Sequence, residues 1–507
     1  MPLFTLLFFK TLNQFYCLTF PNRGHLRECE LDNAERLMRE VVDACTDCDC
    51  CRYIMDTSCL FFPKVYKLWD REKETGEQIT SRELRNLADL CNYCALCPCP
   101  NIREDIVTAK TLFIDRDGLD PYVRTLEDVE RMGKLCGAIP RLSNFFLQNK
   151  HAGSLIKTAV GIHPKRKFPV FPKENFPSWA KRRNLHKKSP VEHKRKVAYF
   201  AGCTARYLFS EVPKAAIHVL KRNNIEVYYP EQNCCGMPSL LEGDRKLALT
   251  FAERTASHLA EVVADGYDVV CSCPTCGYML KNVLSKNAHY SKKYQDFVGG
   301  DKRRIKIPEK MPLKELKTGE APNMEDAPKS SVDELQFRVL NKSIYGKILK
   351  DDGYFSDIDP LKRIKVAEST YDLGEYLLAL HRGGELDTQL GPVPGKMVYY
   401  PPCHLREQSI GMPYLDLLAL IPGISMESIQ SDFYCCGIAG IMGFKKNFYN
   451  ASIQMGSRLM AKIKQLDPDQ LTTDCLSCRL QFNQMTHYPV HHPIEILCES
   501  YNRGYQI

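Results

Sequence analysis

Long apolar runs are missing from this chain of 507 residues. The apolar run near its start, residues 3–9, has only seven residues before Lys10, whereas a membrane-spanning helix needs about 20. No positive charge precedes this run and no small-residue cleavage site follows it, so a signal peptide is not indicated. We expect residues 1–34 to form a poorly structured extension, with an interfacial anchor as the alternative.

Glycine-rich nucleotide motifs are missing as well. The chain contains neither G-x-G-x-x-G nor a Walker loop, so the sequence predicts no nucleotide or flavin site. Its 44% hydrophobic and 26% charged residues are typical of a soluble globular protein, and its length suggests about three domains.

Cysteine, by contrast, is abundant: the chain has 24. These residues fall in tight doublets and triplets, which favour metal binding over long-range disulfides. Adjacent residues such as Cys234 and Cys235 cannot form a disulfide with each other without severe strain. The pattern therefore predicts metal-bound thiolates in a reducing cytoplasm.

One five-cysteine set occurs twice. Thirty residues separate the first cysteine from the Cys-Cys-Gly in one copy and thirty-one in the other; the next gaps are thirty-seven and thirty-eight. Agreement within one residue at both intervals indicates an internal duplication, and thiolates at fixed spacing are what iron–sulfur clusters require. The sets are Cys203, Cys234, Cys235, Cys273 and Cys276, and Cys403, Cys435, Cys436, Cys475 and Cys478.

The sequence around each set alternates between strand and helix patterns. This alternation predicts a small α/β unit with parallel strands. The thiols would then lie where strands end and helices begin, an edge whose backbone N–H groups and helix dipoles favour an anionic cluster. We expect strands at 197–200, 225–229 and 268–271, and at 397–400, 424–429 and 471–473, with helices at 244–264 and 446–465.

Nine further cysteines lie between Cys45 and Cys99. Three cysteines at intervals of three can surround one face of a cubane cluster, and in two-cluster ferredoxins the fourth ligand comes from the other motif. By this logic one [4Fe–4S] cluster has the ligands Cys45, Cys48, Cys51 and Cys99, and the other has Cys91, Cys94, Cys97 and Cys59.

This assignment has alternatives. Both motifs depart from C-x2-C-x2-C-x3-C-P at the fourth cysteine, so Cys59 and Cys99 are less well defined than the other six, and Cys50 is an alternative to Cys51. Zinc also binds C-x2-C doublets. However, three ligands in one tight turn and sets of five thiols are unlike tetrahedral zinc sites.

The isolated cysteines are expected to be small buried apolar residues: Cys17, Cys29, Cys136 and Cys498, with Cys271 left outside the five-thiol spacing. His404, beside Cys403, is a candidate donor to a cluster sulfur or proton carrier, with a structural role as the alternative. His491 and His492 fit no metal pattern.

A strongly basic segment precedes the first unit. Residues 164–196 have twelve Lys or Arg against two Glu. With Phe171, Phe176 and Trp179 interleaved, this composition suits an anionic lipid surface or an acidic partner, and a solvated linker is the alternative. No nucleic-acid-binding fold accompanies the charge, so no nucleic acid partner is predicted.

The combined motifs resemble the CCG-domain iron–sulfur proteins, which include the C subunit of anaerobic glycerol-3-phosphate dehydrogenase and the B and D subunits of heterodisulfide reductase. The resemblance covers residues 35–500. Its carriers are Cys435-Cys436-Gly-Ile-Ala-Gly440, Gly443-Phe-Lys-Lys446, Pro402-Cys403-His404 and His492-Pro493-Ile494. It implies a noncubane [4Fe–4S] cluster at each complete five-cysteine set, in addition to the two cubanes.

Two functions follow from the resemblance. The first is an electron-transfer subunit of a flavin-dependent dehydrogenase, of glycerol-3-phosphate or 2-hydroxy-acid type. Because clusters pass single electrons and substrate oxidation transfers two, this flavin-free chain needs a flavoprotein partner and a quinone or other membrane-associated acceptor. The second is a heterodisulfide reductase-like subunit that cleaves a disulfide at a noncubane cluster, a two-electron reaction. The enzyme question stays open between them.

The predicted fold class is α/β, with duplicated CCG cysteine-rich domains and an N-terminal, mostly helical dicluster ferredoxin-type domain. The expected location is the cytoplasm, with peripheral contact at the inner face of the membrane as an option. The predicted segments are an extension (1–34), the ferredoxin-type domain (35–110), a helical region and basic linker (111–196), the first CCG domain (197–285), a charged insertion with a connecting helix (286–395) and the second CCG domain (396–507).

Overall fold

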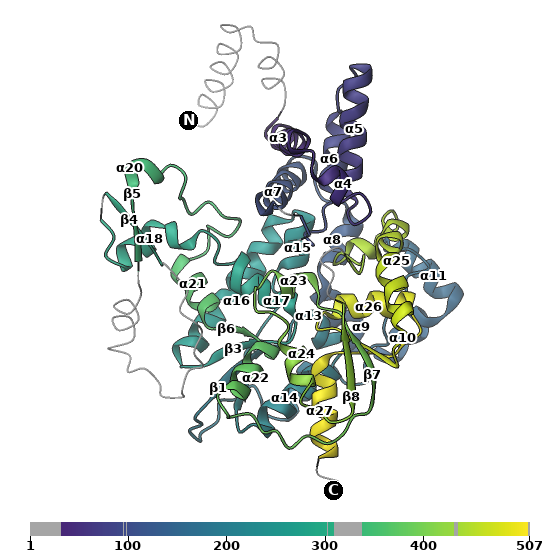
Figure 1. Cartoon of the computed structure of the whole chain (residues 1–507), viewed down its shortest axis with the longest axis vertical. Coiled ribbons are helices and arrows are strands. Elements are labelled where there is room, and N and C mark those ends of the chain that lie inside the picture. Colours follow the sequence, from purple (N-terminus) through teal and green to yellow (C-terminus); the bar gives the residue numbers. More distant parts are fainter. Residues whose placement is uncertain are drawn as a thin grey trace. The chain divides into compact units, whose positions relative to one another are not determined.

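The computed structural model describes residues 32–94, 96–97, 99–301, 303–308, 337–429 and 434–504. The predicted extension up to residue 31, with Cys17 and Cys29, lies outside these ranges. The chain divides into two units (Figure 1): unit 1 is Met1–Asp120 with Leu241–Asp244, and unit 2 is Pro121–Leu240 with Arg245–Ile507.

The described part of unit 1 consists of helices joined by loops. Helix α3 (Asn33–Cys48) begins after Asp32, whose carboxylate accepts the backbone N–H groups of Ala34 and Glu35. Helix α6 (Ser81–Ala88) begins with a capping box between Thr80 and Glu83. Such caps satisfy N–H groups that have no partner inside the helix. The helices, packed around one apolar core, are α3 (Asn33–Cys48), α4 (Cys51–Ile54), α5 (Phe61–Thr75), α6 (Ser81–Ala88) and α7 (Pro100–Asp117).

Two parallel four-stranded sheets organise unit 2. The first has the order β2-β1-β3-β6 and the second β10-β9-β7-β8, so β1 and β7 occupy equivalent central places. The predicted strands are confirmed, but each sheet has a fourth strand that the sequence did not reveal. The strands are β1 (Lys196–Phe200), β2 (Glu226–Tyr228), β3 (Asp268–Cys271) and β6 (Thr370–Asp372), then β7 (Gly395–Tyr399), β8 (Ile424–Ser428), β9 (Gln470–Thr472) and β10 (Val490–His491).

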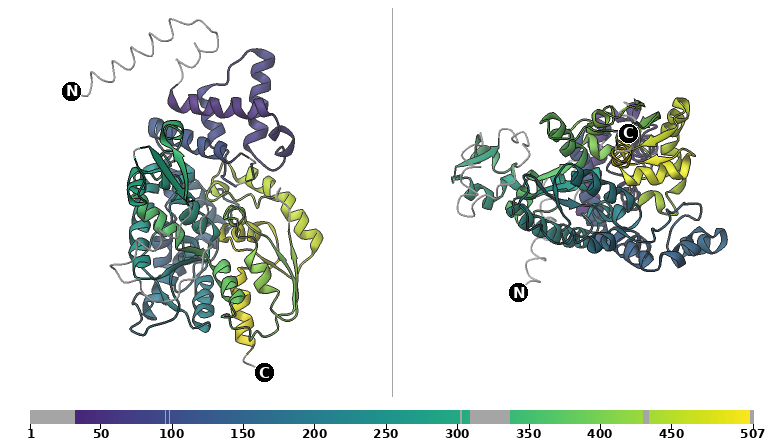
Figure 2. Two further views of the ribbon diagram at one scale, coloured as in Figure 1. Left: turned by 60° about the vertical axis from the view of Figure 1, so that its left-hand side comes forward. Right: turned by 90° about the horizontal axis from the view of Figure 1, so that it is seen from below.

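Helices cover both sheets, as parallel strands require. One apolar core joins residues of the two sheets, including Tyr199 and Tyr399, to helices α14 and α27, and Figure 2 shows these layers from two further sides. The helices are α13 (Cys203–Tyr207), α14 (Glu211–Arg222), α15 (Met237–Glu242), α16 (Arg245–Ala264), α17 (Pro274–Tyr278), α22 (Leu373–Arg382), α23 (Cys403–Arg406), α24 (Pro413–Leu418), α25 (Tyr449–Leu466), α26 (Leu476–Met485) and α27 (Pro493–Arg503).

The predicted insertion after residue 285 contains regular structure in its described part. β4 (Arg304–Pro308) pairs antiparallel with β5 (Phe337–Asn341), and three helices accompany this pair: α18 (Lys292–Phe297), α20 (Lys342–Tyr345) and α21 (Pro360–Glu368). The chain then enters β6, which completes the first sheet. The first sheet therefore takes a strand from the predicted insertion.

The segment before β1 corrects two expectations. The predicted helical stretch is divided into short helices: α8 (Pro121–Glu127), α9 (Val129–Ala138), α10 (Pro140–Gln148) and α11 (Lys150–Ala159), with α12 (Phe176–Arg182) further on. Within the basic segment Phe171 and Phe176 are buried, and Phe176 packs against Tyr199 and Tyr229. These two rings belong to the interior, so their expected contact with lipid was wrong.

Candidate iron–sulfur sites

The first five-thiol set lies where the strands of the first sheet end. Cys203 begins α13 after β1, Cys234 and Cys235 follow β2, and Cys273 precedes α17, which contains Cys276. The Sγ atoms of Cys203 and Cys234 are 3.7 Å apart. Hydrogen bonds from Cys234 and Cys276 lower the pKa of Cys235 to about 6. The thiolate form that binds iron is therefore favoured at the centre of the set.

The second set repeats this placement in the second sheet. Cys403 begins α23 after β7, and Cys475 precedes α26, which contains Cys478. The Sγ atoms of Cys478 and Cys436 are 3.2 Å apart, and the backbone N–H of Gly437 donates to the Sγ of Cys435 at 3.3 Å. Hydrogen bonds from Cys435 and Cys478 hold the pKa of Cys436 well below its usual value. Both sets thus favour one thiolate at the adjacent pair.

Two glycines are required by this packing. Gly202 has φ +72°, and a Cβ there would lie 2.8 Å from the Sγ of Cys276. Gly437 has φ +87°, and a Cβ there would clash with the backbone oxygen of Ser452. Only glycine combines this left-handed backbone with so close an approach. The helices that follow the first cysteines, α13 and α23, have five and four residues, so the expected helix-dipole contribution is limited there.

The two sets are connected by direct contacts within unit 2. His404, beside Cys403, lies with its Nδ1 3.0 Å from the Oγ1 of Thr275, which stands between Cys273 and Cys276. The His404 ring also stacks on Tyr278 with centroids 5.1 Å apart. His404 therefore bridges the two sets, whichever tautomer it adopts.

His492 makes the second bridge, which sequence reasoning missed. Its side chain caps α27, and its Nε2 lies 2.9 Å from the backbone oxygen of Ser272, directly before Cys273. Burial lowers the pKa of His492 to about 3, so the ring is neutral. The sequence signal for this contact was the His492-Pro493-Ile494 motif. Because His492 does not belong to a metal-ligand spacing, the motif did not predict a contact between the two CCG domains.

The cysteines of unit 1 affect one another's pKa values across both motifs. Burial raises the pKa of Cys45 to about 12, with nearby Cys51 and Cys99 contributing to the rise. Burial likewise raises the pKa of Cys59 to about 12, with Cys91 adding to the effect. Cys99 thus lies near the first motif, whereas Cys59 lies near cysteines of both motifs, because Cys59 also acts on Cys45 and Cys51 acts on Cys59. Cys50 is exposed, and its thiol adds to the rise in the pKa of Cys51.

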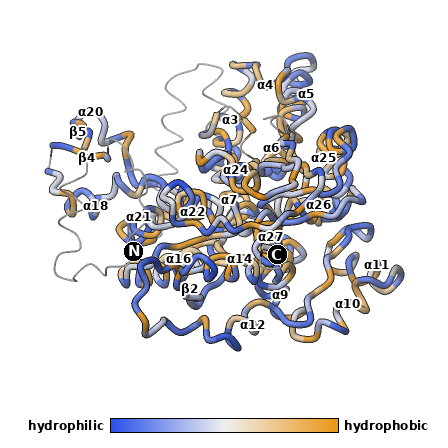
Figure 3. The backbone as a smooth tube through the Cα atoms, turned by 60° about the horizontal axis from the view of Figure 1, so that its bottom comes forward, coloured by the Kyte–Doolittle hydropathy of each residue, from blue (hydrophilic) through white to orange (hydrophobic). Residues whose placement is uncertain are grey.

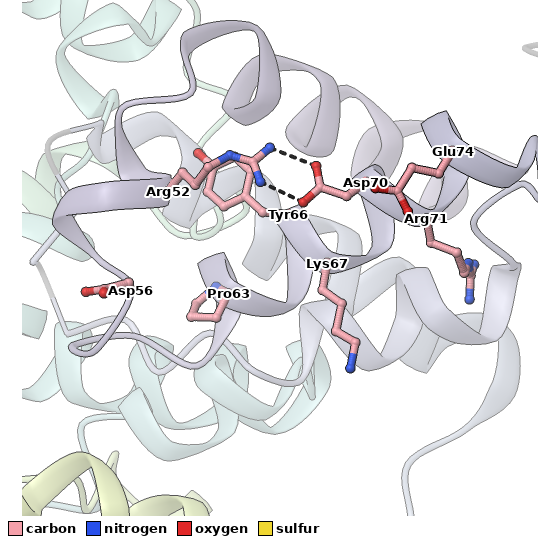
Figure 4. Close-up of a pocket in the computed structure, with 8 residues that line it drawn as sticks. All are labelled: Arg52, Asp56, Pro63, Tyr66, Lys67, Asp70, Arg71 and Glu74. Carbon is pink, nitrogen blue, oxygen red and sulfur yellow. Dashed lines mark hydrogen bonds and ion pairs between the residues drawn. The ribbon is translucent and has the colours of Figure 1, made fainter.

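An arginine supports the first of these motifs. The guanidinium of Arg52, next to Cys51, donates to both carboxylate oxygens of Asp70 at 2.7 and 3.0 Å and lies over the Tyr66 ring, 4.4 Å from its centroid (Figure 4). The Tyr66 hydroxyl donates to the backbone oxygen of Cys45 at 3.1 Å. These contacts connect helix α5 to the backbone of Cys45 and to Arg52, which follows Cys51.

The donor set fits iron–sulfur clusters. Within the described residues, no three His, Cys, Asp or Glu side chains are arranged to hold one metal ion. A cluster makes a different demand, because its thiolates are distributed around several irons and do not converge on one metal ion. The two five-thiol sets meet that demand. In each set the thiols lie close together and one thiolate is stabilised, and the backbone beside them leaves no room for a Cβ.

Comparison with known proteins agrees with this chemistry. The CCG family, described as a cysteine-rich domain, matches residues 197–281 and 397–483, the two segments built on the sheets. The chain thus contains two CCG cysteine-rich domains.

The chain is also homologous to subunits of known enzymes and to a lactate utilization protein. It is 24% identical to the C subunit of anaerobic glycerol-3-phosphate dehydrogenase from Escherichia coli K12 over 377 residues, 74% of this chain and 76% of that protein. It is 23% identical to the B subunit of fumarate reductase (CoM/CoB) from Methanothermobacter marburgensis over 56% of this chain and 41% of that protein. It is 21% identical to lactate utilization protein A of Halalkalibacterium halodurans over 55% of this chain and 85% of that protein.

Proposed function

We propose that this chain is the iron–sulfur electron-transfer subunit of a flavin-dependent dehydrogenase that oxidises glycerol 3-phosphate or a 2-hydroxy acid. The observation that carries the proposal is the contact between the two five-thiol sets through His404 and Thr275. Two adjacent redox sites in one compact unit suit the passage of electrons from one to the other. The homologous dehydrogenase subunit supports the choice of substrate class.

Four clusters would carry these electrons. Unit 1 would hold two cubane [4Fe–4S] clusters on its eight cysteines, as a ferredoxin-type domain does, and each CCG domain would hold a noncubane [4Fe–4S] cluster on its five. The clusters supply one-electron transfer when bound. The protein's own groups keep the thiols together and, through burial of eight of the ten CCG cysteines, exclude water from them.

A flavoprotein partner and a membrane acceptor complete the proposal. Oxidation of the alcohol transfers two electrons, which a flavin divides into single steps. The chain would receive them from the partner's flavin and pass them toward a quinone.

A disulfide reductase is the second candidate. Both five-cysteine sets are complete, and Cys273 and Cys403 are only partly buried, so one cysteine in each set has some contact with solvent. A radical-type signal induced in the oxidised protein by one particular thiol would favour this function over conduction.

Iron content tests the proposed clusters directly. Anaerobic purification followed by iron and sulfide analysis is expected to give about sixteen irons per chain, from four clusters of four. Electron paramagnetic resonance (EPR) of the reduced protein should show cubane and noncubane signals. Zinc in place of iron, or eight irons or fewer, would contradict the four-cluster proposal.

A face suited to a membrane surface lies on α9, α10 and α11. No helix among the described residues has the length and apolar character needed to cross a bilayer, but these helices expose large apolar side chains, including Leu135 (66% exposed), Phe145 (65%) and Leu155 (74%). Figure 3 shows apolar stretches on α10 and α11, at the edge of unit 2. Residues 131–173 contain no Asp or Glu and nine Lys or Arg, of which Lys157 and Arg166 are buried.

This combination fits an anionic lipid surface. Withdrawing one such apolar side chain from water contributes roughly 1.5–3 kcal/mol, and each basic residue near anionic lipid about 1 kcal/mol. We propose that this face holds the chain near a membrane quinone. The expected lipid contacts are therefore the exposed side chains of this face and not the buried Phe171 and Phe176.

Vesicle flotation tests this face. The wild-type chain is expected to float with vesicles that contain anionic phosphatidylglycerol, and the double change Phe145→Asp and Leu155→Asp should reduce binding at least tenfold, which corresponds to about 1.4 kcal/mol. Ile348→Asp is the matched control, because Ile348 is 75% exposed and lies outside the face. Equal binding by the double variant would overturn the lipid assignment. Loss of binding to a purified flavoprotein partner instead would assign the face to that protein.

A further inference from the structure

A pocket of about 480 Å³ lies in unit 2 and is lined by α14, α27 and the end of α12. Helix α14 belongs to the first CCG domain, whereas α27 follows β10 of the second sheet, and these two helices pack against each other (Figure 1). Helix α12 comes from the basic segment before the first sheet. Pockets of roughly 300–1,000 Å³ at the junction of domains are typical of small-molecule sites.

The wall that α12 and α14 form is basic. Arg183 directly follows α12, and its guanidinium lies over the Trp179 ring, 4.6 Å from the centroid. His218 and Lys221 stand three residues apart on α14, a spacing that places both on one face of a helix, and both line the pocket as exposed side chains. Three side chains that can donate hydrogen bonds to an anion therefore share this pocket.

The glutamates that line the pocket are each held in an ion pair. The pairs are Glu211 with Lys214 at 2.7 Å, Glu495 with Arg479 at 2.8 Å, and Glu499 with Arg503. Exposed pairs of this kind contribute little to stability, but they balance the negative charge of the lining. Arg183 and Lys221 then add one positive charge each.

A phosphate monoester matches this lining better than a carboxylate does. It carries a charge of about −1.5 to −2 at neutral pH, which Arg183 and Lys221 together offset, whereas a monocarboxylate carries a single negative charge. Arginine presents a planar fork of donors to phosphate oxygens, and lysine acts as a point charge. His218 supplies a further donor, and the Trp179 ring offers apolar surface to the carbon part of the ligand.

We propose that this pocket binds a small, soluble phosphate monoester, held by Arg183, His218 and Lys221 at the junction of the two CCG domains. Binding requires neither a cluster nor a flavoprotein. It gives part of the basic segment a role other than lipid contact. Because the ligand touches helices on both sides of the junction, it stabilises the folded packing of the two domains in proportion to its occupancy.

Isothermal titration calorimetry of the purified holoprotein tests this site, with glycerol 3-phosphate, inorganic phosphate and lactate as separate probes. Glycerol 3-phosphate is expected to bind at least tenfold more tightly than lactate, and inorganic phosphate should compete with it. Arg183→Gln and Lys221→Gln should each weaken glycerol 3-phosphate binding at least tenfold, or about 1.4 kcal/mol, because each removes a charge-assisted hydrogen bond.

Arg182→Gln is the matched control. Arg182 belongs to the same basic segment, but it pairs with Glu174 at 2.6 Å and is not among the residues that line the pocket. This variant should bind glycerol 3-phosphate as the wild type does. The inference is overturned if neither phosphate probe binds at millimolar concentration, or if lactate binds equally well. Unchanged binding in both pocket variants, or an equal loss in Arg182→Gln, also overturns it.

Discussion

Replacing Cys436 with serine is expected to remove the second noncubane cluster and lower the iron content from about sixteen to about twelve per chain. Cys436 is buried between Cys435 and Cys478, 3.2 Å from the Sγ of Cys478, and its pKa is held well below the usual value. Serine cannot supply a comparable anion, because its hydroxyl ionises only at far higher pH. The loss should be complete rather than partial.

The measurement combines iron analysis with EPR of the reduced protein. One noncubane signal should vanish while the cubane signals of unit 1 keep their intensity, since those clusters draw on a separate set of cysteines. Cys271→Ser is the matched control: Cys271 is also buried, in β3 two residues before Cys273, but it stands outside the five-thiol set. Loss of iron in this control as well, or retention of all four signals in Cys436→Ser, would contradict the assignment.

The strands and thiols of the CCG domains could be predicted because their signals are local. An apolar strand such as β1 or β7, a cysteine at its end and a glycine after the adjacent pair all fall within short windows, and the duplication allowed each copy to check the other. The parallel sheets follow from the same alternation of strand and helix.

The missing features depend on distant parts of the chain. β6 and β10 have three and two residues, too few for a periodic signal, and they are strands because they pair with β3 and β9. Arg166 looked like one charge among twelve in a basic segment, yet its partners are Gln481 and Ser452, about 300 residues later. No sequence pattern distinguishes such a buried arginine from its exposed neighbours.

Burial shifts the balance between the two proposed functions. Eight CCG cysteines are buried and only Cys273 and Cys403 are partly exposed, and His404 occupies the contact between these two residues' loops. A disulfide substrate would have to approach through that contact, whereas electrons cross buried protein without opening it. The packing therefore favours conduction, and completeness of both sets remains the argument for catalysis.

Replacing Cys99 with alanine is expected to remove one cubane of unit 1, and the cubane lost should be that of Cys45, Cys48 and Cys51. Cys99 precedes α7 at the end of the second cysteine motif, but its thiol is among the groups that raise the pKa of Cys45 and Cys51. We expect iron to fall to about twelve per chain. Cys50→Ala is the neighbouring control and should keep about sixteen.

Double substitutions identify which cluster is lost, because residues that serve one cluster are not additive. Cys45→Ala combined with Cys99→Ala should still leave about twelve irons, since both remove the same cubane. Cys91→Ala combined with Cys99→Ala should leave about eight, since each removes a different one. If instead the Cys45 and Cys99 pair leaves about eight irons and the Cys91 and Cys99 pair about twelve, Cys99 belongs with its own motif and the fourth ligands are not exchanged. Cys91 and Cys99 are closer in sequence than Cys45 and Cys99. Their losses of iron add only if the fourth ligands are exchanged between the two motifs.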